Sequence, residues 1–313
     1  MLNRRHIRIK VMQTLYASNR SESEDIKHRE SFLDHSLNST YDLYLSLLSL
    51  IIEVHKKAID RYEKSQRLLS KKNGTQSNRK FIDNEVLVFL SNNKAITEAL
   101  EKRKLNPWYL DFEYVDLTHK AIVESDIYED YLSTPDSTFK EDKQFFINIF
   151  EDIIAPNDKL YDYFEDKKLT WLDDIPVVNT FILKLVRKFK PNASEQHFLP
   201  NLFKDSDDRD FAMELLRKTL LNQSSLSEEI AAKTKNWDSE RITQIDTVLM
   251  QMAICEFQKF PSIPVKVTIN EYLEIAKEYS TPKSSNFING ILDKIVKEYK
   301  DKNQLNKVGR GLM

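Results

Sequence analysis

The first twenty residues contain a group of basic side chains whose chemistry suits a phosphate backbone. Four of them lie within the first ten residues, Arg4, Arg5, Arg8 and Lys10, and no acidic residue precedes Glu22. On a helix, Arg5, Arg8 and Tyr16 share one arc of roughly 80°, whereas Lys10 is expected to face solvent elsewhere. Guanidinium groups pair with phosphates and an aromatic ring can stack on an unpaired base, so the stripe predicts binding of single-stranded RNA. A solubilising N-terminus and an arginine-rich transit peptide are the alternatives.

Two further patterns raise the question of a metal site. The D-x-x-H spacing, which places both side chains on one helical face, occurs at Asp25–His28 and at Asp116–His119. Di-metal sites in helical bundles use E-x-x-H twice with two further glutamates, whereas here aspartates stand in densely charged surroundings. We therefore predict no metal site. Cys255, the single cysteine, excludes a disulfide framework and a cysteine-rich zinc site, and its apolar neighbours predict a small core residue.

Glycine is scarce, with four in 313 residues. Rossmann and P-loop phosphate cradles need clustered glycines that open a helix, so we expect neither a nucleotide cofactor nor the catalysis that depends on one. Only Gly290 falls inside an apolar, helix-like run, where glycine costs about 1 kcal/mol relative to alanine. The missing side chain would let another backbone approach, and we interpret Gly290 as a residue of close helix packing.

The bulk composition shows no global charge bias. Apolar residues make up 41% of the chain and the formal net charge is -2, so any nucleic-acid surface must be local. The longest apolar stretch, residues 43–52, is too short to span a bilayer. No signal peptide is recognisable, and we expect a cytoplasmic protein without a membrane partner.

Helices must position these residues. Apolar residues recur at helical spacing from Ile242 to Ala253 and again from Ile269 to Ala276. Alternation typical of strands is rare, so we predict an all-α fold. Polar connectors are expected at about residues 70–80, 133–143 and 204–210, and a disordered tail from about Lys300.

A weak internal repeat has a period of 66 residues. Residues 145–183 align with residues 211–249, and Trp171 falls on Trp237. Two apolar helices separated by a polar stretch and a tryptophan would produce this pattern twice. Any two amphipathic helices align at some offset, which is the alternative, but the shared tryptophan favours a degenerate duplication.

The C-terminal block carries a long, ordered set of motifs. It begins with R-I-x-x-I-D at residues 241–246 and reaches Glu256 at the end of the same helix. It continues through I-P-x-x-V-x-I-N-E at 263–271 and closes with F-I-N-G-x-L-D at 287–293. Together with R-R-x-x-R at residues 4–8, these motifs resemble the NusB family of transcription antitermination factors. The resemblance covers residues 1–18 and roughly 208–297, about a third of the chain.

This resemblance implies a helical bundle of NusB type with a long insertion. We expect residues 1–18 to form a basic first helix that packs on a C-terminal bundle, residues 206–298. Residues 19–205 would be an inserted helical region, in which the internal repeat suggests a degenerate copy of the following helix pair. Residues 299–313 would form the disordered tail.

The resemblance also implies partners and site residues. Members of the family bind boxA-type RNA together with ribosomal protein NusE, as part of the transcription elongation complex, and serve antitermination in ribosomal RNA transcription without catalysis. The RNA surface would include Arg4, Arg5, Arg8, Gln13, Tyr16, Phe287 and Asn289, with Lys283 and Ser285 added by position only. Glu240 and Asp246 are the candidates for the NusE contact. For Asn270–Glu271 a side-chain hydrogen-bond pair that braces a turn is the simpler explanation.

Three functional hypotheses result. The first is a non-enzymatic, RNA-binding antitermination factor. The alternative is a helical protein–protein scaffold of NusB fold that does not bind RNA and uses the inserted region as its surface. NusB-like domains also precede ribosomal RNA methyltransferases, but the C-terminal place of the motifs and the lack of a glycine-rich cofactor strand argue against an enzyme. Family members occur as monomers and dimers, so a homodimer stays open.

Overall fold

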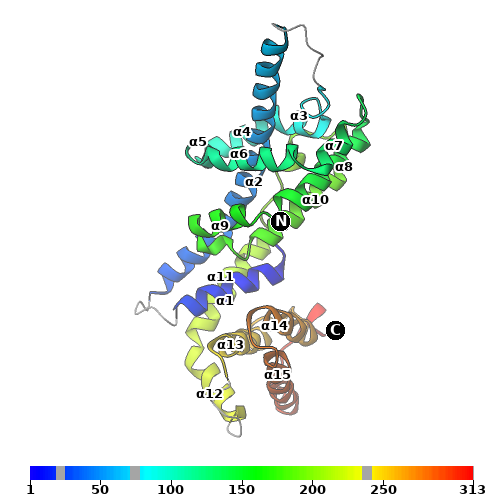
Figure 1. Cartoon of the computed structure of the whole chain (residues 1–313). Coiled ribbons are helices and arrows are strands. Elements are labelled where there is room, and N and C mark those ends of the chain that lie inside the picture. Colours follow the sequence, from blue (N-terminus) through cyan, green and yellow to red (C-terminus); the bar gives the residue numbers. More distant parts are fainter. Residues whose placement is uncertain (19–24, 71–77, 235–241, 313) are drawn as a thin grey trace. The chain divides into compact units, whose positions relative to one another are not determined.

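The computed structural model describes the chain except residues 19–24, 71–77, 235–241 and 313. Every regular element within these limits is a helix, which confirms the predicted all-α fold (Figure 1). The chain divides into two compact units, the first formed by residues 1–37 and 202–313 and the second by residues 38–201. None of the helices in the described parts combines the length and the apolar character that a membrane span requires.

The first unit is built around one central helix, α13. Its elements are α1 (Arg4–Ser18), the first part of α2 (Ile26–Ser70), α11 (Ser206–Leu221), α12 (Gln223–Thr234), α13 (Gln244–Lys259), α14 (Val265–Tyr279), α15 (Ser284–Asp301) and η5 (Gly309–Leu312). α13 contacts α1, α11, α12, α14 and α15. It is buried almost all round, from Val248 to Phe257 without a break, as expected of a helix that is apolar on every side.

α1 belongs to this unit although residues 19–205 separate it from α11 to α15. Ile7, Val11 and Leu15, spaced four residues apart along one face of the helix, are completely or almost completely buried. The helix packs on α11, α13 and α14. α2 adds Leu33 and Leu37 to the same core, so this unit extends past residue 18 to Leu37. On the other side of the insertion it resumes at Leu202, close to the expected residue 206.

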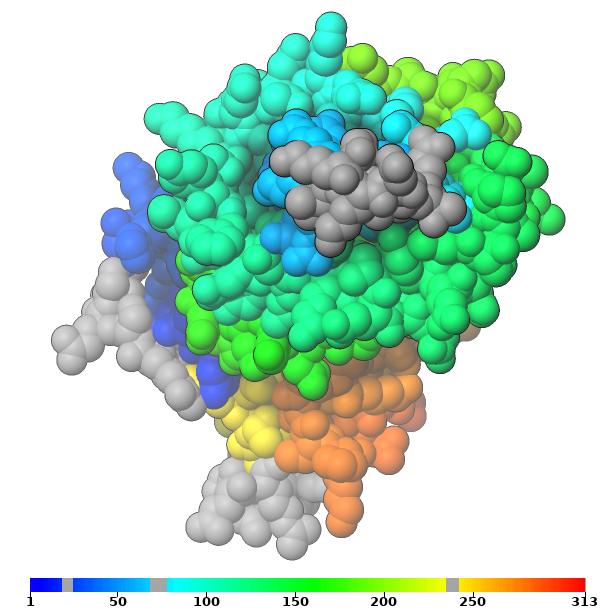
Figure 2. Space-filling view, turned by 45° about the horizontal axis from the view of Figure 1, so that its top comes forward, coloured from blue at the N-terminus to red at the C-terminus, as the bar shows by residue number. Residues whose placement is uncertain are grey.

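The second unit consists of the rest of α2 and a series of shorter helices. They are α3 (Glu85–Ser91), α4 (Lys94–Lys102), α5 (Pro107–Leu110), α6 (Phe112–Val123), α7 (Asp126–Leu132), α8 (Phe139–Ile149), η1 (Phe150–Ile154), α9 (Asp158–Lys167), η2 (Leu169–Trp171), α10 (Ile175–Lys188) and η3 (Glu195–Phe198). Aromatic rings fill much of its core; Tyr131 stacks on Phe145 at a centroid distance of 3.9 Å. Residues of α5 and α6, teal in Figure 2, lie at its surface.

The connectors are shorter than expected because side-chain caps start helices inside them. Thr138 forms a capping box with Glu141 at the start of α8, within the connector expected at residues 133–143. Asp205 caps α11 by accepting a hydrogen bond from the amide of Asp208, within the connector expected at 204–210. Most of the connector at 70–80 lies outside the described residues.

The two copies of the internal repeat correspond helix for helix. Phe145 in α8 and Phe211 in α11 are 3% and 5% exposed. Leu160 in α9 and its counterpart Leu226 in α12 are both buried, as are Leu183 in α10 and Leu249 in α13. Trp237 lies outside the described residues. The matching order of helices and of buried positions supports a duplication, which stays a prediction.

The segment after Lys300 differs from the disordered tail that its polar composition predicts. Gln304 donates its amide hydrogen to the carbonyl of Tyr299 at 2.8 Å, and Val308 donates to the carbonyl of Pro261 at 3.1 Å. Gly311 is buried. Backbone hydrogen bonds, together with Leu305 packed against the core, therefore order a segment whose mostly polar composition predicts disorder.

Candidate nucleic-acid interface

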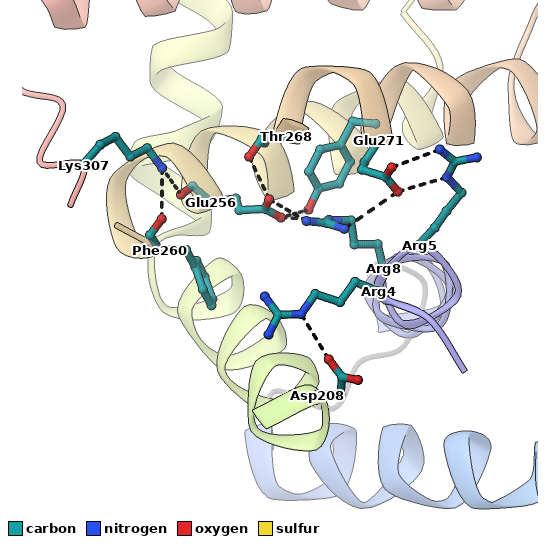
Figure 3. A network of polar contacts seen from close by, with 10 residues as sticks. Arg4, Arg5, Arg8, Asp208, Glu256, Phe260, Thr268, Glu271 and Lys307 are labelled. Atoms are coloured by element: carbon teal, nitrogen blue, oxygen red, sulfur yellow. Dashed lines mark hydrogen bonds and ion pairs between the residues drawn. The ribbon is translucent and has the colours of Figure 1, made fainter. Parts of the chain in front are cut away.

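Arg8 lies in the interior of the first unit, paired with Glu256 (Figure 3). Its Nη2 and Nε donate to the two carboxylate oxygens at 2.7 and 3.0 Å. The two side chains are 2% and 0% exposed. Burial lowers the pKa of Arg8, but the charge of Glu256 and its hydrogen bonds outweigh burial, so the pKa stays above its ordinary value. Contrary to the prediction that Arg8 faces RNA, its charge is neutralised inside the protein.

Glu256 is the centre of this buried network. Besides Arg8, its carboxylate accepts hydrogen bonds from the hydroxyl of Thr268 at 2.7 Å and from that of Tyr272 at 3.1 Å. Burial and the neighbouring carboxylate raise the pKa of Tyr272 well above its usual range, so the phenol stays a donor. In the sequence, Glu256 stands out only as part of the R-I-x-x-I-D helix. A charged residue at the end of an apolar helix was the available signal that a buried cation must face it.

Arg4 and Arg5 project from the first turn of α1 and remain partly exposed, 42% and 37% respectively. Arg5 forms a two-pronged ion pair with Glu271 at 2.9 and 3.0 Å. The hydrogen bonds to Glu271 raise the pKa of Arg5 despite partial burial. Arg4 donates through Nε to Asp208 at 3.1 Å, and its guanidinium lies over the ring of Phe211. Each arginine is thus held in one direction by a carboxylate of a neighbouring helix.

These two arginines line an open hollow of about 1030 Å³ in the first unit. Its other charged side chains are Arg8, Lys204, Asp205, Asp207, Asp208, Glu271 and Arg310, and Ser262, Ile263 and Pro264 also line it. Four segments of the sequence therefore meet here: the start of α1, the start of α11, the α13–α14 turn with the first part of α14, and the C-terminal segment. Arg310 was not among the residues that the sequence singled out.

The remaining candidates on α1 and α15 have mixed exposure. Gln13 and Tyr16 are partly exposed, whereas Lys10, expected to face solvent, is only 2% exposed. On α15, Lys283 is exposed just before the helix and Phe287 is partly exposed. Ser285 and Asn289 are likewise partly exposed, and Asn289 donates to Asp293 at 3.4 Å. α13 and α14 each contact both α1 and α15. A continuous RNA surface over both helices stays a prediction.

Gly290 does not serve close helix packing. A Cβ built at this position would meet no atom within 4 Å outside its own helix, and the residue is exposed. The predicted role as a packing residue is therefore wrong. Nothing inside the described part of the chain offsets the cost of a glycine in the middle of α15.

The two residues predicted to contact a protein partner are not found on a described surface. Asp246 is 1% exposed and forms a capping box with Thr243 at the start of α13. Its carboxylate also accepts hydrogen bonds from the hydroxyls of Ser280 at 2.6 Å and Ser284 at 3.0 Å. Burial at the junction of three helices corrects the prediction of a partner contact for Asp246. Glu240 lies outside the described residues.

The expected pairing of Asn270 with Glu271 is also corrected. Both residues lie within α14 and not in a turn, and Glu271 binds Arg5.

Cys255 is 1% exposed, and burial raises the pKa of its thiol to about 11, which confirms a core role. Across the described residues, no three histidine, cysteine or acidic side chains come together as a metal site.

The first unit is thus a small all-α bundle whose first helix is cationic at its exposed end. Residues 180–297 match the family described as the NusB family. The transcription antitermination protein NusB of Salinibacter ruber is 45% identical over 112 residues, which are 36% of this chain and 70% of that protein. The chain belongs to the NusB family, as the motifs predicted.

Other relatives match a similar share of the chain. The transcription antitermination protein NusB of Chloroherpeton thalassium is 40% identical over 129 residues, 41% of this chain and 61% of that protein. That of Geotalea uraniireducens is 35% identical over 130 residues, 41% of this chain and 87% of that protein. No solved structure matches the chain. The family match includes α11 to α15 but neither α1 nor most of the second unit.

Proposed function

We propose that the first unit binds boxA-type single-stranded RNA together with ribosomal protein NusE, as a non-enzymatic factor in antitermination of ribosomal RNA transcription. One observation carries this proposal: in a NusB-family unit, Arg4 and Arg5 stand partly exposed over a hollow, each oriented by a carboxylate. A guanidinium has five N–H donors, and the ion pairs occupy only one of them in Arg4 and two in Arg5. The others suit phosphate oxygens.

Arg8 plays a different part in this proposal. It lies within 3.9 Å of Glu271 through Nη1 while it pairs with Glu256. It therefore supports the carboxylate that orients Arg5, and it does not contact RNA itself. A variant that removes Arg8 would test the stability of the unit before it tests RNA binding, so RNA binding is better tested at Arg4 and Arg5.

The double variant Arg4→Ala/Arg5→Ala is expected to weaken binding of a short boxA-type RNA about ten-fold or more. Each phosphate contact on a single strand contributes about 0.7 to the slope of log K against log salt, so the slope should become shallower by about 1.4. Fluorescence anisotropy at several salt concentrations, with and without NusE, measures both quantities.

The matched control is Arg209→Ala/Arg217→Ala. Both arginines lie on α11 of the same unit, are 53% exposed and form ion pairs, with Asp34 and Glu30, but neither lines the hollow. RNA affinity should be nearly unchanged in this control. Equal losses in the two double variants would mean that binding depends on net charge alone and would overturn the proposed surface.

Gly290→Ala is expected to stabilise α15 by about 0.5–1 kcal/mol, because the helix gains a better helix former and the added Cβ meets no neighbour. If RNA approaches the backbone of α15 at this position, the same variant should lose RNA affinity while its stability rises. Chemical denaturation and anisotropy on the same sample separate the two effects. A destabilised variant would contradict the open surroundings of Gly290.

The scaffold hypothesis is favoured by a different observation in the second unit. Tyr109, Leu110 and Phe112 are 77%, 79% and 61% exposed within one short stretch. Such a cluster of exposed apolar side chains is typical of protein–protein contacts. Absence of RNA binding by the wild-type chain, even with NusE present, would favour this function over the first.

A further inference from the structure

The chain reverses direction after α15 and returns to the α13–α14 turn. Asn303 has a left-handed φ of 50°, and Gln304 then donates its amide hydrogen to Tyr299 in the last turn of α15. We call residues 303–312 the C-terminal strap. The family match ends at residue 297, before the strap begins.

Lys307 connects the C-terminal strap to the C-terminal end of α13 by hydrogen bonds. Lys307 Nζ donates to the carbonyl oxygens of Glu256 at 3.2 Å and Phe260 at 3.0 Å. These carbonyls lie at the C-terminal end of α13, where each also accepts one backbone amide hydrogen, from Phe260 and from Ile263 respectively. A cation is favoured there because the C-terminal end of a helix carries partial negative charge.

Two of the four glycines fix the end of the strap. Gly309 has a φ of 53°, in the left-handed region that favours glycine. Gly311 packs directly on Pro261, since a Cβ on it would lie 1.9 Å from the Pro261 carbonyl oxygen. Val308 adds a backbone hydrogen bond to the same carbonyl. The backbone on both sides of Arg310 is therefore held in place.

Arg310, between these glycines, is exposed and lines the hollow that also contains Arg4 and Arg5. It forms no ion pair with any described residue, and the same holds for Lys204. In contrast, Arg4 forms an ion pair with Asp208, and Arg5 forms one with Glu271. The strap thus supplies the hollow with a cation that forms no ion pair with a carboxylate of the described residues.

We propose that the strap positions Arg310 as a phosphate contact for the RNA, so that the nucleic-acid surface extends from α1 across the hollow onto the C-terminal segment. This inference rests on the proposed function. Asp205 and Asp207 line the hollow from the start of α11 and repel phosphate. The RNA backbone is therefore expected to pass along the side formed by α1 and the strap.

The test compares four proteins in anisotropy titrations with a short single-stranded boxA-type RNA, in the presence of NusE. They are the wild type, Arg310→Ala, Gly311→Ala and the double variant. Arg310→Ala should weaken binding about five-fold and make the salt slope shallower by about 0.7, as expected for one phosphate contact. Gly311→Ala keeps the charge but forces the strap away from Pro261, and should weaken binding to a similar extent. The double variant should bind no more weakly than the weaker single variant.

The outcomes separate this inference from the proposed function. RNA binding that depends on Arg4 and Arg5 but not on Arg310 would overturn the strap contact and leave the proposed function intact. Loss of affinity in Arg310→Ala but not in Gly311→Ala would overturn the positioning role of the strap. No RNA binding by the wild type would overturn both proposals. Arg217→Ala serves as the control for loss of one exposed arginine.

Discussion

Arg8→Ala is expected to destabilise the first unit by about 3–5 kcal/mol, because it leaves the carboxylate of Glu256 buried without its cation. The hydroxyls of Thr268 and Tyr272 still donate to Glu256, but they carry no compensating charge. Hydrogen exchange of the α13 amides measures the loss within this unit, as a lower free energy of opening. Peptides from the second unit report whether the effect is confined to the first.

Two further variants show whether the loss of stability in Arg8→Ala comes from the unpaired charge of Glu256. Arg209→Ala breaks an exposed ion pair and should cost less than about 1 kcal/mol. Arg8→Met/Glu256→Leu should be less destabilised than Arg8→Ala, because it removes both charges and leaves none uncompensated. A loss below about 1 kcal/mol in Arg8→Ala would show that Glu256 obtains its compensation elsewhere and would contradict the buried pair.

Asp246→Ala is expected to cost about 3 kcal/mol, the second largest effect. The substitution removes the capping box of α13 and leaves the hydroxyls of Ser280 and Ser284 without their acceptor. The loss should appear as faster exchange at the start of α13 and at the start of α15, which the carboxylate joins. Chemical denaturation gives the size of the effect.

Thr243→Ala is the matched control for Asp246→Ala. It removes only one hydrogen bond of the capping box, from the amide of Asp246 to the threonine hydroxyl, and should cost about 1 kcal/mol. An Asp246→Ala variant of wild-type stability that fails to bind NusE would contradict the structural role and restore the partner contact predicted from the resemblance.

The apolar faces of the first unit could be read from its sequence. Ile7, Val11 and Leu15 recur at intervals of four, and the same periodicity locates the core of α13. Burial of an apolar stripe depends on local spacing, which the sequence displays directly. The NusB motifs added what spacing could not, namely that α1 belongs with helices on the far side of residues 19–205.

The partners of the charged residues could not be read in the same way. Helical geometry correctly placed Arg5 and Arg8 on one arc, and both guanidinium groups reach Glu271. Which of them stays at the surface depends on Glu256, 248 residues away from Arg8. Periodicity defines the faces of each helix but not which faces meet, so an arginine that compensates a buried carboxylate has the same local pattern as one that faces solvent.

α2 has a consequence for any attempt to shorten the chain. This one continuous helix gives Leu33 and Leu37 to the core of the first unit and then runs on into the second. Excising residues 19–205, as the motifs alone would suggest, takes away both leucines and leaves a hole in the remaining bundle. A minimal version of the protein should instead retain the chain through residue 37 and rejoin it at residue 202, where Leu202 accepts a hydrogen bond from the amide of Leu2.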